Sequence, residues 1–208
     1  MSELLLSPAE ARVLASLVEK SITTPQYYPM TVNAIMLAGN QKTSRSPVMS
    51  LTEGEVGNAL NRLEELKLVA RDSFSARAQK YRHQFSPQLL LKPQTAAILA
   101  TLMLRGPQTL AELRANGSGL GGPTEGEALA AALNDLADRA QPLVVLLPRA
   151  AGQKEARYAH TLCGDAAGAE WAEPEVPAAR PDPGALAALE ARVQALEARL
   201  ADLEALIK

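Results

Sequence analysis

Two histidines and one cysteine are the side chains of this chain best suited to catalysis or metal binding. His160 and Cys163 lie three residues apart, which is half of a zinc site, but no second pair of ligands stands at a matching spacing. His83 and His160 each end a Tyr-x-His sequence in a predicted strand, which is typical of a packed hairpin residue. Cys163 could act as a nucleophile only with a base placed beside it, and it lies at the edge of a predicted domain. We therefore expect no catalytic residue, no metal and no cofactor, and a protein that is not an enzyme.

The glycine-rich sequence NGSGLGGP at residues 116–123 is the next chemical candidate, because glycine-rich loops can bind phosphate. No Gly-Lys-Ser/Thr follows it, and no predicted strand precedes it. We interpret it as a flexible connector.

Nucleic-acid recognition is the chemistry that the sequence favours most. Asparagine and arginine side chains in a predicted helix at 52–66 can contact base edges, and cations around it can contact phosphates. The candidates for DNA contact are Lys42, Arg45, Asn58, Asn61, Arg62, Arg71, Arg77, Lys80 and Arg82.

A repeated pattern predicts the elements that position these residues. ARVLASL at 11–17 recurs as AAILATL at 96–102, TEGE at 52–55 recurs at 124–127, and Tyr-x-His at 81–83 recurs at 158–160. Three landmarks in the same order indicate two related modules that differ by insertions and deletions. The apolar positions of the two TEGE helices align at an offset of 73, whereas the TEGE sequences align at 72. We therefore interpret TEGE itself as the same cap used twice, and the other landmarks as the evidence for duplication. Each TEGE has the Thr-x-x-Glu spacing of a capping box, so we expect both to begin a helix at the Thr.

Each module reads as three helices followed by two strands, which is the winged-helix variant of helix-turn-helix. The middle helices are expected at 30–38 and 109–115 and the third helices at 52–66 and 124–139. The strands are expected at 68–74, 80–85, 143–147 and 157–162. The predicted fold class is mainly α with small β-hairpins (α+β). Two tandem winged-helix domains at 1–86 and 87–163 are followed by an Ala/Pro/Glu-rich linker at 164–183 and a C-terminal coiled-coil helix at 184–208.

Charge decides which part of a module is suited to DNA. Both predicted third helices carry a net charge of −3, whereas residues 67–82 carry +4. Because phosphate neutralisation supplies most non-specific affinity for DNA, we expect the wing rather than the third helix to lead the contact. The alternative is that these are solvated hairpin charges without a partner.

The last predicted segment is a heptad run. Its apolar positions alternate three and four apart, and the candidates for a dimer seam are Leu186, Leu189, Val193, Leu196, Leu200, Leu203 and Ile207. In a parallel pair, Arg192 meets Glu197 of the second copy, and Arg199 meets Glu204. This pattern favours a parallel homodimer, and the alternative is a helix that folds back onto its own chain.

The bulk composition limits the remaining function classes. The chain has 208 residues, a net charge of −2 and a single cysteine, so no disulfide within the chain is possible. No apolar run reaches the roughly 20 residues that a membrane helix needs, and no secretory signal precedes the first helix. We expect a cytoplasmic protein with no membrane contact.

The stretch TPQYYPMTVNAIMLAGNQKTSRSPVMSLTEGEVGNALNRLEELKLV resembles the signature region of the YceH family of uncharacterised bacterial proteins. The resemblance covers roughly residues 7 to 160, and AGNQKTSRSPVM at 38–49 is its most specific part. It implies two winged-helix domains and supplies no catalytic residue.

Two functions follow from these patterns. The first is a non-enzymatic, transcription-regulator-like protein that binds double-stranded DNA through wing-led contacts with the backbone. The alternative is an adaptor that uses its winged-helix surfaces to bind a protein whose identity the sequence leaves unknown.

Overall fold

The computed structural model describes residues 4–73, 78–149, 153 and 155–164. All of them belong to one compact unit that spans Met1–Glu170. The unit has an α+β fold with a winged-helix-like layout, which confirms the predicted fold class. The predicted linker beyond Gly164 and the C-terminal helix with its seven seam candidates lie outside the described residues.

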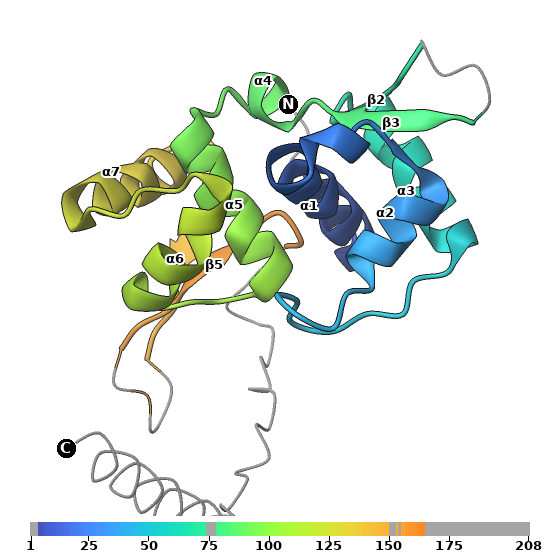
Figure 1. Ribbon diagram of the computed structural model, residues 1–208. Helices are drawn as coiled ribbons and strands as arrows, with labels where there is room; N and C mark the ends of the chain where they lie inside the picture. Colours follow the sequence, from blue (N-terminus) through green and yellow to red (C-terminus); the bar gives the residue numbers. More distant parts are fainter. Residues whose placement is uncertain (1–3, 74–77, 150–152, 154, 165–208) are drawn as a thin grey trace, which may run out of the picture. The chain divides into compact units, whose positions relative to one another are not determined.

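An order of three α-helices followed by two strands occurs twice, first in residues 1–86 (module 1) and then in residues 87–163 (module 2) (Figure 1). In module 1 the elements are α1 (Pro8–Thr23), η1 (Pro25–Tyr27), β1 (Met30–Thr31), α2 (Val32–Gly39), α3 (Glu53–Glu65), β2 (Val69–Arg71) and β3 (Lys80–His83). A short helix, α4 (Phe85–Leu89), joins the modules. In module 2 the elements are α5 (Pro93–Arg105), α6 (Leu110–Gly117), η2 (Ser118–Leu120), α7 (Gly126–Ala137), β4 (Val144–Leu146) and β5 (Tyr158–His160).

The small sheets show the same correspondence. In module 1 the strand order is β1-β3-β2, and Tyr81 pairs with Met30 on one side and with Arg71 on the other. In module 2 β4 pairs with β5, and a single bridge from Gln108 to Tyr158 takes the place of β1. Strand β1 and helix α4 were not expected, since two residues are too few to show an alternating pattern and α4 is only one turn long.

The element bounds differ from the expected ones mainly at the ends. All four expected strands are shorter than predicted, and α2 begins two residues later than expected because Thr31 caps it. Helix α3 occupies most of the expected range, whereas α7 ends at Ala137 rather than Arg139.

The two TEGE sequences have different roles. Thr52 and Glu55 form a capping box at the start of α3, in which the Thr52 N–H donates to Glu55 Oε2 at 2.8 Å. At α7 the cap is Glu125, and it makes no side-chain capping bond. The prediction that Thr124 begins this helix is therefore wrong. The buried positions of the two helices align at an offset of 73, which makes position 125 the counterpart of Thr52.

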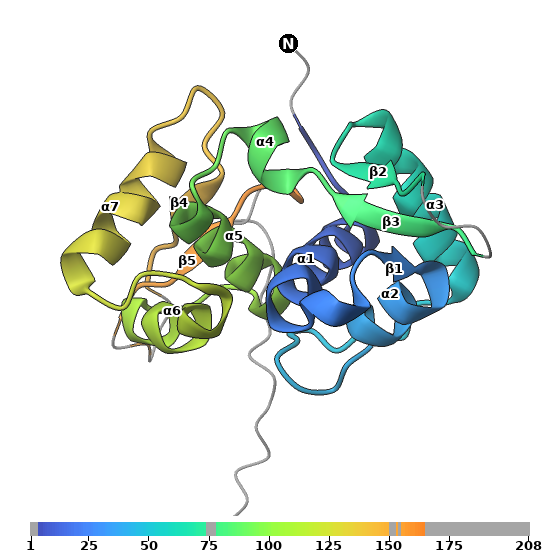
Figure 2. The same ribbon diagram turned by 45° about the horizontal axis from the view of Figure 1, so that its top comes forward.

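Helices α1 and α5 form the centre of the unit. Residues 11–19 and residues 95–104 are buried without interruption, so neither helix keeps a solvent-facing stripe over that length. Each helix packs on the other elements of its own module and on the first helix of the other module (Figure 2). One continuous apolar cluster contains residues of both modules. The described parts of the two modules therefore share a core.

The glycine-rich sequence at 116–123 is an ordered turn, and the expectation of a flexible connector is wrong. It contains the end of α6 and all of η2, and Leu120 is buried. A Cβ on Gly117 would lie 3.0 Å from Ile98 Cδ1, and a Cβ on Gly122 would lie 2.8 Å from the Gly117 carbonyl oxygen. These glycines allow close packing rather than mobility.

The two histidines are held neutral by burial. The Phe85 N–H donates to His83 Nδ1 at 3.3 Å, so His83 carries its proton on Nε2 and donates it to Ser21 Oγ at 3.0 Å. Burial lowers the pKa of His83, and it lowers the pKa of His160 to about 4. No described group accepts from or donates to His160 Nδ1, which is buried. Both histidines thus serve the fold in their neutral form.

We expect the free energy of unfolding to fall as the pH is lowered from 7.5 to 5, because an unfolded His binds a proton near pH 6.5 while folded His160 does not. The contribution of His160 is about 2 kcal/mol over this window. Urea denaturation at several pH values should show a smaller fall in His160→Leu than in the wild type. Equal pH dependence in the two proteins would contradict this account.

Candidate functional site

The solvent face of α3 is polar and carries no bulky apolar side chain. Asn58 and Asn61 are exposed one turn apart. Gly54 and Gly57 lie beside them, and a Cβ built on either glycine meets nothing within 4 Å among the described residues. Neither glycine has a positive φ. The fold of the described chain therefore does not require glycine at these two positions.

Three exposed arginines of the DNA-contact set are paired with acidic residues. Arg62 contacts Glu65 at 2.8 Å, Arg71 contacts Glu64 at 3.0 Å, and Arg82 contacts Asp72. Exposed pairs of this kind contribute about 0–1 kcal/mol each, so they hold the arginines only weakly. These arginines are accessible, but their charge is partly compensated.

Lysines supply the uncompensated charge of module 1. Lys42 and Lys67 are exposed and Lys80 is partly exposed, and none of the three forms an ion pair with another described residue. Lys67, which follows α3 directly, was not among the nine candidates. Its place after the last helical turn was the signal available in the sequence. Arg77 lies outside the described residues.

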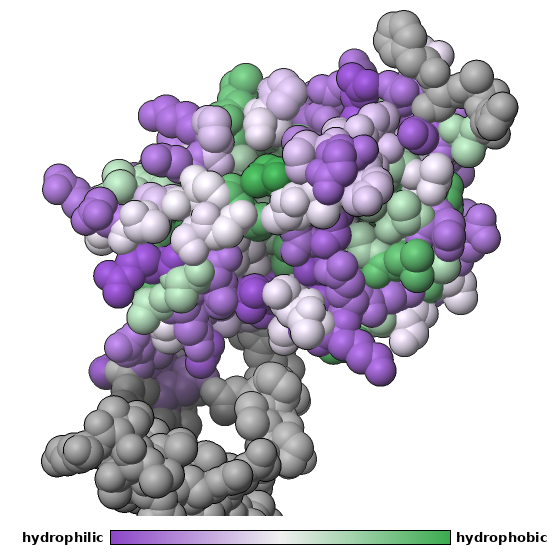
Figure 3. Space-filling model, in the orientation of Figure 1, coloured by the Kyte–Doolittle hydropathy of each residue, from purple (hydrophilic) through white to green (hydrophobic). Residues whose placement is uncertain are grey.

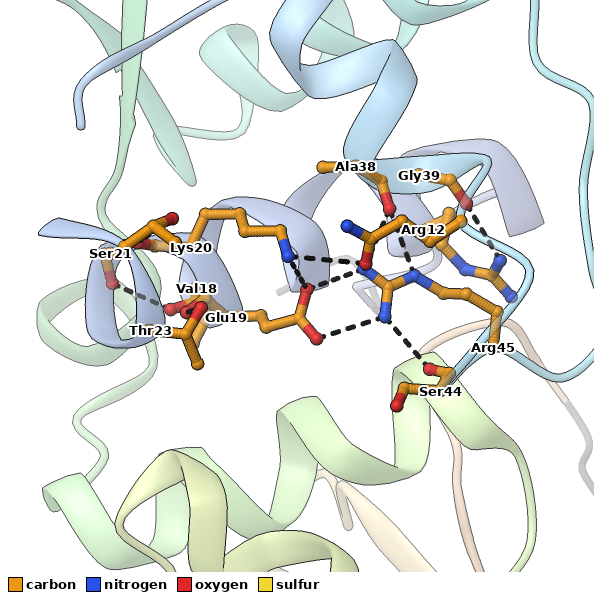
Figure 4. A network of polar contacts seen from close by, with 12 residues as sticks. Arg12, Val18, Glu19, Lys20, Ser21, Thr23, Ala38, Gly39, Ser44 and Arg45 are labelled. Carbon is orange, nitrogen blue, oxygen red and sulfur yellow. Dashed lines mark hydrogen bonds and ion pairs between the residues drawn. The ribbon is translucent and has the colours of Figure 1, made fainter. Parts of the chain in front are cut away.

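Arg45 lies inside the protein, so its selection as a DNA contact is wrong. Its side chain is 0% exposed, and its guanidinium forms a two-point pair with Glu19 at 2.6 and 3.1 Å (Figure 4). The same guanidinium donates to the carbonyl oxygens of Ala38 and Ser44, at 2.8 and 2.9 Å. Desolvation of a charge is compensated only by such pairing, and this arginine is fully engaged within the fold.

Arg12, on α1, is a second buried arginine, and the sequence predicted no role for it. It donates to the Gly39 carbonyl at 3.2 Å and to the Pro47 carbonyl at 2.8 Å. Burial, and then the nearby charge of Arg45, lower the pKa of Arg12 to about 10. Arg12 and Glu19 lie two turns apart on α1, and this break in the apolar pattern was the signal that could have revealed the network.

Carbonyl groups and Glu19 together balance this buried positive charge. Ala38 and Gly39 are the last residues of α2, where the helix dipole is negative and favours cations. Burial raises the pKa of Glu19, but hydrogen bonds and charge from Arg45, and the charge of Lys20 at 3.2 Å, lower it more, so its pKa lies below the usual value. The network is therefore charged at neutral pH.

The loop between α2 and α3 is attached to three helices. Arg45 holds it to α1 and α2, while the Ser46 N–H donates to the Leu104 carbonyl of α5 at 2.9 Å. Arg105 at the end of α5 donates to Ser44 Oγ at 2.7 Å. At its far end, the Asn40 side chain exchanges two hydrogen bonds with the backbone of Leu51, at 2.7 and 2.8 Å. The start of α3 is thereby fixed.

Module 2 offers no equivalent recognition face. At an offset of 73, the counterparts of Asn58, Asn61 and Arg62 are Ala131, Asn134 and Asp135. Arg139, the one cation near the end of α7, donates to the backbone of the join between the modules. Of the three polar side chains, α7 therefore keeps only one asparagine, Asn134.

His160 and Cys163 are the chemical candidates of module 2. Desolvation, and then the charge of Glu10, raise the pKa of the Cys163 thiol to about 11, although part of the residue is exposed. Within the described ranges, no three His, Cys, Asp or Glu side chains lie close enough to hold a metal ion. None of the described helices is long and apolar enough to cross a membrane.

The family model described as "Protein of unknown function, DUF480" matches residues 6–153. The chain belongs to this family. A UPF0502 protein of Burkholderia ambifaria MC40-6 is 46% identical over 170 residues, which cover 82% of this chain and 72% of the relative. A UPF0502 protein of Burkholderia vietnamiensis G4 is 48% identical over 167 residues, or 80% and 70% of the two chains. A third, of Burkholderia pseudomallei 668, is 44% identical over 203 residues, or 98% and 86%.

This DUF480 membership agrees with the resemblance to an uncharacterised bacterial family that the sequence showed. The stretch at 38–49, on which that resemblance depends most, is the end of α2 and the loop that Arg12 and Arg45 hold. In this DUF480 protein, that stretch therefore supplies Arg45 and several of the carbonyl acceptors of the buried polar network.

We expect Arg45→Ala to destabilise the protein by about 3–5 kcal/mol, because it leaves the Glu19 carboxylate buried without its main partner. The matched control is Arg62→Ala, which removes the same side chain from an exposed pair and should cost at most about 1 kcal/mol. Urea denaturation measures both values. Similar losses in the two variants would show that the buried pair is not a main support of the fold.

Proposed function

We propose that this protein binds double-stranded DNA through module 1 and acts by binding rather than by catalysis. In this proposal cations after α3 and on the wing contact the phosphate backbone, as expected from the sequence. The solvent face of α3, which was not expected to lead the contact, also lies against the DNA. The role is that of a transcription regulator.

The observation that carries the proposal is the bare polar face of α3. A glycine inside a helix costs roughly 0.5–1 kcal/mol relative to alanine, and neither packing nor backbone conformation accounts for Gly57. A glycine at such a place lets an external surface approach the helix backbone closely. Asn58 and Asn61 flank this gap, and asparagine can form two hydrogen bonds with adenine in the major groove.

Acidic residues on α3 are less of an obstacle than their number suggests. Glu55 is engaged in the cap, where bonds from the backbone and the side chain of Thr52 lower its pKa. Glu64 and Glu65 pair with arginines that phosphate can also bind. Lys67 and Lys80 remain for direct phosphate contact. The expected binding is modest in strength and strongly dependent on salt.

A protein adaptor remains the second candidate, and a specific surface favours it. Leu37 on α2 is 62% exposed and Val48 in the following loop is 55% exposed. Figure 3 shows apolar side chains over α2 on this face of the molecule. Exposed apolar surface of this kind is common at sites where proteins bind one another.

Fluorescence anisotropy with a random-sequence duplex, at low and at moderate salt, tests the DNA proposal. We expect binding at low salt that weakens as salt is added, and a clear loss of affinity in Lys67→Glu/Lys80→Glu. Lys92→Glu, at the start of α5 in module 2, is the control with the smaller expected effect. Absence of binding at low salt would reject the proposal and favour the adaptor.

We expect Gly57→Ala to have opposite effects on stability and on binding. Alanine favours the helix and meets no described neighbour, so the free energy of unfolding should rise by about 0.5–1 kcal/mol. The added methyl group should separate α3 from the DNA and lower affinity several-fold, as anisotropy would show. A variant that is more stable and binds DNA as well as the wild type would remove α3 from the interface.

A further inference from the structure

Three consecutive residues of the α2–α3 loop direct their hydrogen bonds to different modules. Ser44 Oγ accepts from Arg105, and the Ser46 N–H donates to the Leu104 carbonyl, so both contact the end of α5. Arg45, between them, turns to α1 and α2. The loop is thus held from both sides, by module 1 through a buried ion pair and by module 2 through two hydrogen bonds.

Module 2 has a firmly buried helix that can support the loop, but it lacks two of the three polar side chains that module 1 presents for DNA. Its α7 presents Ala131 and Asp135 where module 1 presents Asn58 and Arg62. Its α5, in contrast, is buried over ten consecutive residues and packs on α1, which makes its end a firm point of attachment. The two bonds to the loop start from this end.

We propose that module 2 is a brace for the α2–α3 loop rather than a second DNA reader, and that Arg105 is the positioning residue through which it acts. The functional part of this inference rests on the proposed DNA binding, whereas the brace itself does not. Arg105 touches no reading residue directly. It acts through Ser44.

The path from Arg105 to α3 runs through Ser44 and then along the loop to Leu51. Ser44 has a φ of 60°, a left-handed conformation that is uncommon for a serine, and it is held there between Arg105 and Arg45. The chain then runs to Leu51, whose backbone is fixed by Asn40, and Thr52 caps α3 next. Release of Ser44 would therefore loosen the segment that sets where α3 begins.

The test compares Arg105→Ala and Arg105→Lys with Arg114→Ala. Arg114 is an exposed cation on α6 of the same module, so its removal makes the same change in net charge without touching the loop. Lysine can still donate one hydrogen bond to Ser44, so Arg105→Lys should retain part of the loop stability and DNA affinity that Arg105→Ala loses. Asn134→Ala on α7 tests whether module 2 reads DNA.

Amide hydrogen exchange of residues 40–55 in the free protein is the first measurement, and duplex affinity by anisotropy is the second. Arg105→Ala should speed exchange in this segment and weaken DNA binding about fivefold or more, with Arg105→Lys in between. Arg114→Ala and Asn134→Ala should match the wild type in both.

Unchanged exchange at 40–55 in Arg105→Ala would overturn the brace. Unchanged affinity in Arg105→Ala, or a loss of affinity in Asn134→Ala comparable with that in Asn58→Ala, would overturn its role in DNA binding. If the wild type binds no duplex at low salt, the proposed function fails, and hydrogen exchange alone still decides whether module 2 braces the loop.

Discussion

The rest of the described structure depends on the hydrogen bonds and the ion pair of the buried Arg45 guanidinium. A charge removed from water is tolerated only if nearly all of its hydrogen-bond donors are satisfied. Here the acceptors are the Glu19 carboxylate, the Ala38 carbonyl near the end of α2 and the Ser44 carbonyl in the loop. Because these acceptors come from α1, from α2 and from the loop itself, they fix the middle of the loop against module 1. The Asn40 side chain then fixes Leu51, just before α3 begins.

The second constraint is the packing of α1 against α5. Both helices are buried on all sides over nine or ten residues, so neither module can complete its core alone in this arrangement. The two modules share a core but differ in the exposed residues of their third helices. Module 1 keeps the polar face of α3 in solvent, and in module 2 the counterparts of Asn58, Asn61 and Arg62 on α7 are Ala131, Asn134 and Asp135.

Local patterns predicted the elements well where the signal was local. The capping box at Thr52 and the apolar stripes of α1 and α5 depend on residues within a few positions of one another. The predictions failed where a distant contact decided the outcome. Arg45 was predicted to be a surface cation because its partner Glu19 is distant, on α1. The sequence at 116–123 was predicted to be flexible because the close packing of Gly117 against Ile98 is a distant contact as well.

The sequence by itself determined the α+β class, the order of three helices and two strands in each module, the repetition of that order and the resemblance to an uncharacterised bacterial family, because periodicity, capping and motif depend on neighbouring residues. Only the tertiary structure decided which charges face water. Burial depends on what lies across from a side chain, and Gly39 and Pro47, the partners of Arg12, and Glu19, the main partner of Arg45, are 26 to 35 residues away. The DNA-contact set lost Arg45 for that reason, while Asn58 and Asn61 stayed on an open face.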